Sequence, residues 1–144
     1  FRRLVIPLLS PGAESIGLSL GETYNPPGGW STYPPHRHDR SPRRGADRQA
    51  ELETQHQEVY LFRFAPADGF GLARLYDEKA SSGQGTDQAM VFRHADALAI
   101  GSGFHTVCGA PGYHLHYLWA LAGPRPVQPV SRLDPEHAWV EAEV

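Results

Sequence analysis

The chain has 144 residues, of which 40% are hydrophobic and 20% charged, and this composition indicates one folded domain and excludes a disordered chain. Its net charge of −3 excludes the basic surface of a nucleic-acid-binding protein, and no apolar run reaches the length of a membrane span. We therefore expect a single domain over residues 1–144, with no nucleic-acid and no membrane partner. The one cysteine, Cys108, excludes an intramolecular disulfide and fits a reducing compartment, so a cytoplasmic protein is expected.

Short apolar segments separated by glycine and proline predict an all-β architecture. The 15 glycines and 13 prolines divide the chain at fairly even intervals, and no segment shows a long helical stripe. About eight short strands joined by turns favour a small barrel or jelly roll that encloses one small ligand. The expected strands are Ser15–Tyr24, Tyr33–Asp39, Glu58–Phe64, Gly71–Tyr76, Gln88–Arg93, Ala97–Ile100, Gly103–Cys108 and Tyr113–Leu121.

Less regular structure is expected in two places. The stretch Arg40–Gln57 is charged, contains proline and glycine, and is expected to form an exposed loop. The end of the chain, Asp134–Val144, has room for one helical turn. His56 and His137 fall in these two stretches, and His94 follows the expected strand Gln88–Arg93; we expect all three at the surface or in turns.

The second expected strand carries two histidines, His36 and His38, separated by one residue. Residues i and i+2 of a strand point to the same face, so both imidazoles can bind one ion. Neutral imidazole is the commonest protein ligand for divalent transition metals. The spacing also occurs by chance, and the alternative is a pair of ordinary strand residues.

Glu58 and His105 complete the candidate ligand set. Glu58 opens a β-branched and aromatic run, and His105 follows two glycines that indicate a sharp bend. Together with His36 and His38 they make three imidazoles and one carboxylate, which with water in the remaining positions is an open catalytic site. We expect one divalent ion, zinc first, with manganese, iron, nickel and cobalt also compatible.

The block from Gly21 to Asp39, GETYNPPGGWSTYPPHRHD, resembles the signature of the 5-deoxy-glucuronate isomerases of inositol catabolism. The similarity continues through Glu58-Val59-Tyr60, Gly103-Phe104-His105 and Asp134-Pro135-Glu136-His137-Ala138-Trp139. It implies a cupin-type double-stranded β-helix, a jelly-roll barrel, with the metal on the four residues named above. That family consists of longer, bicupin proteins, and the resemblance places this chain in their C-terminal, metal-carrying half.

The resemblance also implies a reaction, the aldose–ketose isomerisation of 5-deoxy-glucuronate to 5-dehydro-2-deoxy-gluconate. A proton moves between adjacent carbons through an enediolate that a metal stabilises, and a base must carry that proton. Glu53 and Tyr60 are the expected catalytic residues. Arg74 is the expected clamp for the carboxylate of the small sugar acid, with Tyr33 and His116 as further substrate-binding residues. An exposed loop position or core packing is the alternative for each of them.

Two rival functions stay open. An Fe(II)-dependent cupin oxygenase shares the ligands and needs an open position for dioxygen. A non-catalytic cupin that binds a sugar acid is favoured by departures from the family pattern at Gln57, His114, His116 and Trp119. The specificity of the Trp30–Asp39 block favours the isomerase. Barrels of this kind commonly pair through edge strands, so a homodimer is expected.

Overall fold

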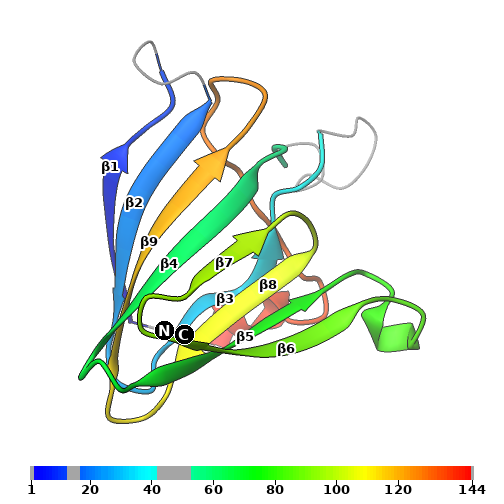
Figure 1. The fold of residues 1–144 in the computed structure, drawn as a ribbon. Coiled ribbons are helices and arrows are strands. Elements are labelled where there is room, and N and C mark those ends of the chain that lie inside the picture. Colours follow the sequence, from blue (N-terminus) through cyan, green and yellow to red (C-terminus); the bar gives the residue numbers. More distant parts are fainter. Residues whose placement is uncertain (1, 13–16, 42–52, 144) are drawn as a thin grey trace.

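Two antiparallel five-stranded sheets pack against each other in the computed structural model, which describes residues 2–12, 17–41 and 53–143 (Figure 1). The first sheet has the strand order β1 (Leu4–Leu9), β2 (Leu18–Asn25), β9 (His114–Ala122), β4 (Gln57–Ala65) and β7 (Ala97–Ile100). The second sheet has the order β10 (Arg132–Leu133), β3 (Trp30–Arg37), β8 (Phe104–Gly109), β5 (Phe70–Tyr76) and β6 (Asp87–Arg93). The expected all-β architecture is confirmed. No helix among the described residues is long and apolar enough to span a membrane.

Each of the eight expected strands is present, although several bounds differ. The second begins at Trp30 and ends at Arg37, and the start expected at Ser15 lies outside the described residues. Most of the expected loop, residues 42–52, also lies outside them. Two short 3-10 helices, η1 (Ala80–Ser82) and η2 (Ala138–Glu143), complete the structure, and η2 occupies the segment where a helical turn was expected.

Two strands were not predicted, β1 and β10. The apolar run of β1 contains Pro7 and does not alternate with polar residues, so it lacks the usual pattern of a half-buried strand. Pro7 is tolerated because β1 lies at the edge of the first sheet, where one side of the strand pairs with none of the described strands. β10 has only two residues, too few to show any periodicity.

The core lies between the two sheets and follows the alternation of β4. Tyr60, Phe62 and Phe64 are buried, whereas Val59 and Arg63 on the opposite face are exposed. Phe62 stacks on Phe92 of the second sheet, with the ring centroids 3.7 Å apart. The even-numbered residues of β4 therefore form the face that joins the sheets.

The inner faces of the strands change along their length from aromatic to ionisable side chains. On β4, the buried aromatic residues are followed at one end by the buried carboxylate of Glu58. On β8, Val107 belongs to the core cluster, and two residues away His105 is fully buried. Aromatic residues thus fill one part of the interior, and ionisable side chains gather beside them.

A bulge in β3 sets the position of this ionisable end. Ser31 is opposite Val107 and His36 is opposite His105, so five steps along β3 match only two along β8. Within the bulge, Thr32 adopts a φ of 56°, and its Oγ1 accepts the Val107 N–H at 3.2 Å. The threonine hydroxyl thereby replaces a backbone acceptor that the bulge removes, and the ladder resumes with the two imidazoles side by side.

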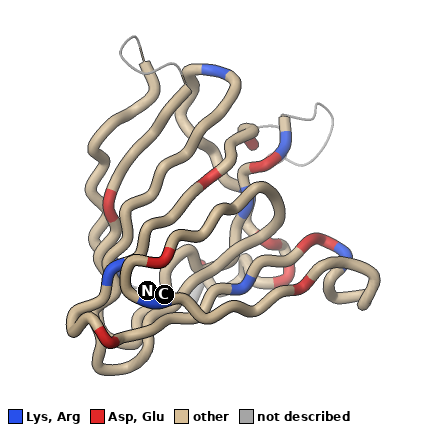
Figure 2. Tube along the Cα trace, in the orientation of Figure 1, with Lys and Arg blue, Asp and Glu red and all other residues tan. Residues whose placement is uncertain are grey.

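Charged residues are unevenly distributed over the two sheets (Figure 2). β1 and β9 contain no Lys, Arg, Asp or Glu, and β2 contains only Glu22. Acidic and basic residues instead gather around the second sheet and the loops at its edges (Figure 2). The outer face of the first sheet therefore exposes several large apolar side chains, among them Leu4, Ile6 and Val59.

Candidate metal centre

Three imidazoles and one carboxylate converge between the sheets, just beyond the aromatic core. One ring nitrogen from each of His36, His38 and His105 lies within 4.8 Å of the others. Glu58 Oε2 lies 3.1 Å from His38 Nε2 and 3.3 Å from His105 Nε2. The structure thus brings together the four ligands that the sequence predicts. His36 lies on β3 and His105 on β8, both in the second sheet, and His38 follows the last residue of β3. The carboxylate comes from β4 in the first sheet.

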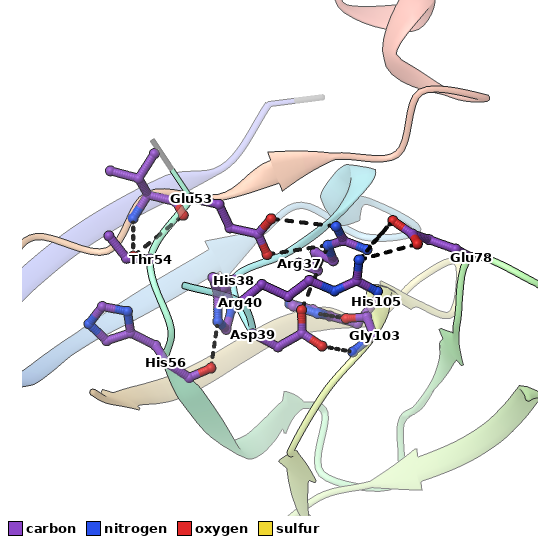
Figure 3. Close-up of polar contacts among 11 residues, drawn as sticks. Arg37, His38, Asp39, Arg40, Glu53, Thr54, His56, Glu78, Gly103 and His105 are labelled. Carbon is purple, nitrogen blue, oxygen red and sulfur yellow. Dashed lines mark hydrogen bonds and ion pairs between the residues drawn. The ribbon is translucent and has the colours of Figure 1, made fainter. Parts of the chain in front are cut away.

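Backbone carbonyls fix which nitrogen of two histidines carries the proton. His38 Nδ1 lies 3.1 Å from the carbonyl oxygen of His56, and His105 Nδ1 lies 3.5 Å from that of Gly103 (Figure 3). Because a carbonyl only accepts, each Nδ1 is the donor in the neutral ring, and the lone pair lies on Nε2. Carbonyl contacts of this kind are the usual support of metal-binding histidines.

The two Nε2 lone pairs point toward one negatively charged oxygen, Glu58 Oε2. Two lone pairs and a carboxylate oxygen repel one another unless a cation, either a proton or a metal ion, lies among them. Three imidazoles and a carboxylate match the donor preferences of zinc and similar transition metals. The residues present therefore fit a divalent metal ion.

The protonation states of the site also suit a metal. Burial, together with the neighbouring His105, holds the pKa of His36 well below its usual value, so this imidazole is neutral. Burial opposes the charged form of Glu58, but when a proton rather than a metal ion lies among these groups, hydrogen bonds with His105 and His38 outweigh the burial and lower the pKa of Glu58 to about 2. Burial likewise opposes protonation of His38, but the Glu58 carboxylate prevails and raises its pKa. At neutral pH the site presents an anionic carboxylate and at least one neutral imidazole.

Tyr60, one of the two expected catalytic residues, lines the pocket beside Glu58. Its hydroxyl donates to Glu58 Oε2 at 2.9 Å. Burial and the nearby negative charge of Glu58 raise the pKa of Tyr60 well above its usual value, so the side chain remains a phenol. Tyr60 therefore orients the carboxylate as a hydrogen-bond donor.

A pocket of about 140 Å³ leads from solvent to His36, Glu58 and Tyr60. This volume is below the roughly 300 Å³ at which drug-sized ligand pockets begin, so the pocket suits a small molecule. The other residues that line it are Arg3, Val5, Thr23, Thr32, Tyr117, Trp119 and Leu121. Sequence reasoning missed Thr23 and Tyr117, although both lie on the inner faces of their strands and alternation along β2 and β9 points to them. Arg3 was missed because β1 was not predicted.

Glu53, expected to act as a catalytic residue, does not line this pocket. It is buried and accepts from Arg37 Nε at 3.2 Å (Figure 3). Arg37 lies between His36 and His38 in sequence and points to the opposite face of the second sheet, over the ring of Phe104. Glu53 thus neutralises a buried guanidinium behind the metal centre.

The same network supports His105. Arg37 also contacts Glu78 at 2.5 Å and Asp39 at 3.7 Å (Figure 3). Asp39 in turn accepts the N–H of Gly103 at 2.8 Å, which holds the bend that precedes His105. The buried ion pairs therefore connect the segments that carry the histidines.

The structure does not bring the three expected substrate-binding residues to the pocket. Arg74 is opposite Thr106 rather than His105, so it lies on the outer face of the second sheet and pairs with Asp87 at 2.8 Å. It lines a separate hollow of about 260 Å³ that contains no imidazole. His116 stacks on Tyr24 on the outer face of the first sheet.

Tyr33 and His56 also differ from expectation. Tyr33 packs near Trp30 and His137, with ring centroids 5.4 Å and 6.3 Å away, and does not line the pocket. His56 is only 2% exposed, so its expected surface position is wrong. Its backbone explains the burial, because its N–H donates to the His38 carbonyl at 2.6 Å while its own carbonyl supports the His38 ring. His94 is exposed and follows β6 in a turn, as expected.

Comparison with known proteins identifies the relatives of this chain. The model of the KduI/IolB family matches residues 1–140. The chain belongs to the KduI/IolB family. It is 32% identical to the 5-deoxy-glucuronate isomerase of Geobacillus kaustophilus over 138 residues, which cover 96% of this chain and 46% of that protein. It is 33% identical to the 5-deoxy-glucuronate isomerase of Lacticaseibacillus casei over 123 residues, which cover 85% of this chain and 41% of that protein.

Solved structures agree with this membership and with the cupin fold. An IolB-like protein from Salmonella typhimurium LT2 superposes with a TM-score of 0.82 and 31% identity, over 96% of this chain and 48% of that one. A cupin superfamily protein from Desulfitobacterium hafniense gives a TM-score of 0.51 and 11% identity, over 85% and 78% of the two chains, which supports the fold alone. The expected cupin barrel is confirmed. This KduI/IolB chain spans about half the length of the relatives it matches.

Proposed function

We propose that this chain isomerises 5-deoxy-glucuronate to 5-dehydro-2-deoxy-gluconate, with one zinc ion held by His36, His38, Glu58 and His105. The observation that carries the proposal is the convergence of these four side chains at the base of a small pocket, in a chain similar to 5-deoxy-glucuronate isomerases. A divalent ion bound there supplies Lewis acidity to adjacent sugar oxygens.

The residues of the chain have separate roles in this proposal. Tyr60 holds the Glu58 carboxylate in place and keeps a proton at its phenolic oxygen, inside the pocket. Thr23 and Tyr117 present hydroxyl groups along the wall, which suit the hydroxyl groups of a sugar acid. Val5 and Leu121 exclude part of the surrounding water. The reaction needs one proton moved between neighbouring carbons, and Glu58 is the only carboxylate among the described residues that line the pocket.

Product analysis tests the isomerase. We expect the zinc-loaded chain to convert 5-deoxy-glucuronate to the ketone without consuming oxygen, as followed by NMR and an oxygen electrode. Glu58→Gln keeps the size of the side chain but removes its charge, and we expect at least about 100-fold slower conversion. Arg63→Gln, exposed on the opposite face of β4, is the matched control and is expected to retain full activity. Oxygen-dependent turnover would point to an oxygenase, and binding without conversion to a sugar-acid-binding cupin.

We also propose that the chain forms a homodimer. Leu4, Leu8 and Val59 are 59%, 57% and 46% exposed, and an apolar surface of this kind is commonly covered by a partner. We expect light scattering to give the mass of a dimer, and a monodisperse monomer would contradict the proposal.

A further inference from the structure

Arg3 places a permanent positive charge at the pocket. Among the described residues that line it, Arg3 is the only one that is positively charged at every physiological pH. Because Arg3 lines the same pocket as His36, Glu58 and Tyr60, its guanidinium is close enough to act on a ligand there.

The register of β1 explains this position. Val5 is opposite Thr23, and both side chains line the pocket, so alternate residues of β1 face inward. Arg3 lies two residues before Val5, just ahead of the strand, and it also lines the pocket while remaining exposed to solvent. It thus occupies the mouth, whereas His36 and Glu58 lie at the base.

Arg3 is also unpaired among the described residues. Arg37, Arg40 and Arg74 each form an ion pair with an aspartate or glutamate. Arg3 has no such partner in the part of the chain that the structure describes. An unpaired guanidinium is a two-pronged donor whose geometry matches a carboxylate.

We propose that Arg3 binds the carboxylate of the sugar acid, so that the other end of the molecule reaches His36 and Glu58. This assignment rests on the proposed function and replaces Arg74, which lies on the outer face of the other sheet. The carboxylate is chemically remote from the carbon atoms that exchange the proton. Arg3 therefore contributes binding that is equal in the ground state and the transition state.

Steady-state kinetics of the zinc-loaded chain with 5-deoxy-glucuronate tests the assignment. For Arg3→Ala we expect KM to rise about 10- to 100-fold while kcat changes by less than about threefold, because a charge-assisted hydrogen-bonded pair is lost. Arg3→Lys retains the positive charge but lacks the two-pronged donor of the guanidinium, and its KM is expected to lie between those of the wild type and Arg3→Ala. Arg2→Ala removes the same charge one residue away, outside the pocket lining, and is expected to behave as wild type.

Each result decides the assignment. The assignment is overturned if Arg3→Ala has the KM of the wild type, or if KM rises as much in Arg2→Ala as in Arg3→Ala. It is also overturned if the KM of Arg3→Lys is as high as that of Arg3→Ala. A lower zinc content in Arg3→Ala would also overturn it, because Arg3 would then act on the metal centre. If calorimetry shows that the wild type binds the acid but no conversion is seen, only the isomerase proposal fails. The role of Arg3 is then tested by comparing the Kd values of the wild type and the three variants. If the wild type neither converts nor binds the acid, both proposals fail.

Discussion

Replacing His36 and His105 together by alanine is expected to abolish metal uptake, whereas the wild-type chain holds about one ion. The two imidazoles face each other across β3 and β8, with ring centroids 4.6 Å apart. Their removal leaves one imidazole and one carboxylate, too few donors to hold a transition metal against water. The two remaining groups, His38 and Glu58, already lie 3.1 Å apart in the wild-type chain and can pair with each other without a metal ion.

Metal analysis after incubation with zinc and dialysis measures this effect. The double variant His94→Ala/His114→Ala is the matched control, because it also removes two imidazoles but both are exposed and outside the cluster. It is expected to retain the wild-type metal content. A wild type that takes up no zinc, manganese, iron, nickel or cobalt would contradict the metal centre and with it the proposed reaction.

Phe62→Ala is expected to lower the free energy of unfolding by about 3–5 kcal/mol. Phe62 has 0% of its surface exposed and contacts aromatic rings from both sheets. Besides its stacking on Phe92, it meets Tyr60 and Tyr117 edge-on, with centroids 5.8 Å and 5.9 Å away. Alanine leaves a cavity that these flat, mutually packed rings cannot close. A domain of ordinary stability, about 5–15 kcal/mol, thereby loses a large part of it.

Urea unfolding followed by circular dichroism, with chelator present, measures this loss independently of any metal. Phe70→Ala is the matched control, because Phe70 is 44% exposed at the start of β5, and its expected cost is about 1 kcal/mol or less. Equal costs for the two variants would show that the stacked rings do not carry the stability assigned to them.

The sequence predicts the interior of this protein better than its edges. If Glu58 points inward as a ligand, the two-residue period of a strand places Tyr60, Phe62 and Phe64 on the same inner face, where the structure has them. The histidine spacing similarly indicates that His36 and His38 share a face. β1 escaped prediction because its stability comes from pairing with β2 rather than from its own pattern. Arg3, the arginine that lines the pocket, was not predicted as a site residue for the same reason, because it directly precedes β1.

Contacts between distant segments explain the remaining differences. Which face Arg74 occupies depends on its pairing with Thr106, and no pattern within β5 reveals that register. Glu53 is drawn into the interior by Arg37, sixteen residues earlier in the chain. A local pattern reports the periodicity of a strand, but only the assembled sheets determine which residues become neighbours.

The proposed ligands of the metal centre are divided between the two sheets, and this division has a mechanical consequence. An ion held by histidines of one sheet and by Glu58 of the other would cross-link the sheets through the interior. Separating the sheets would then also break bonds to the ion, so bound zinc should raise the free energy of unfolding of the chain. The pocket still admits substrate, because its mouth at Arg3 lies beside the edge strand β1, which carries none of the proposed ligands.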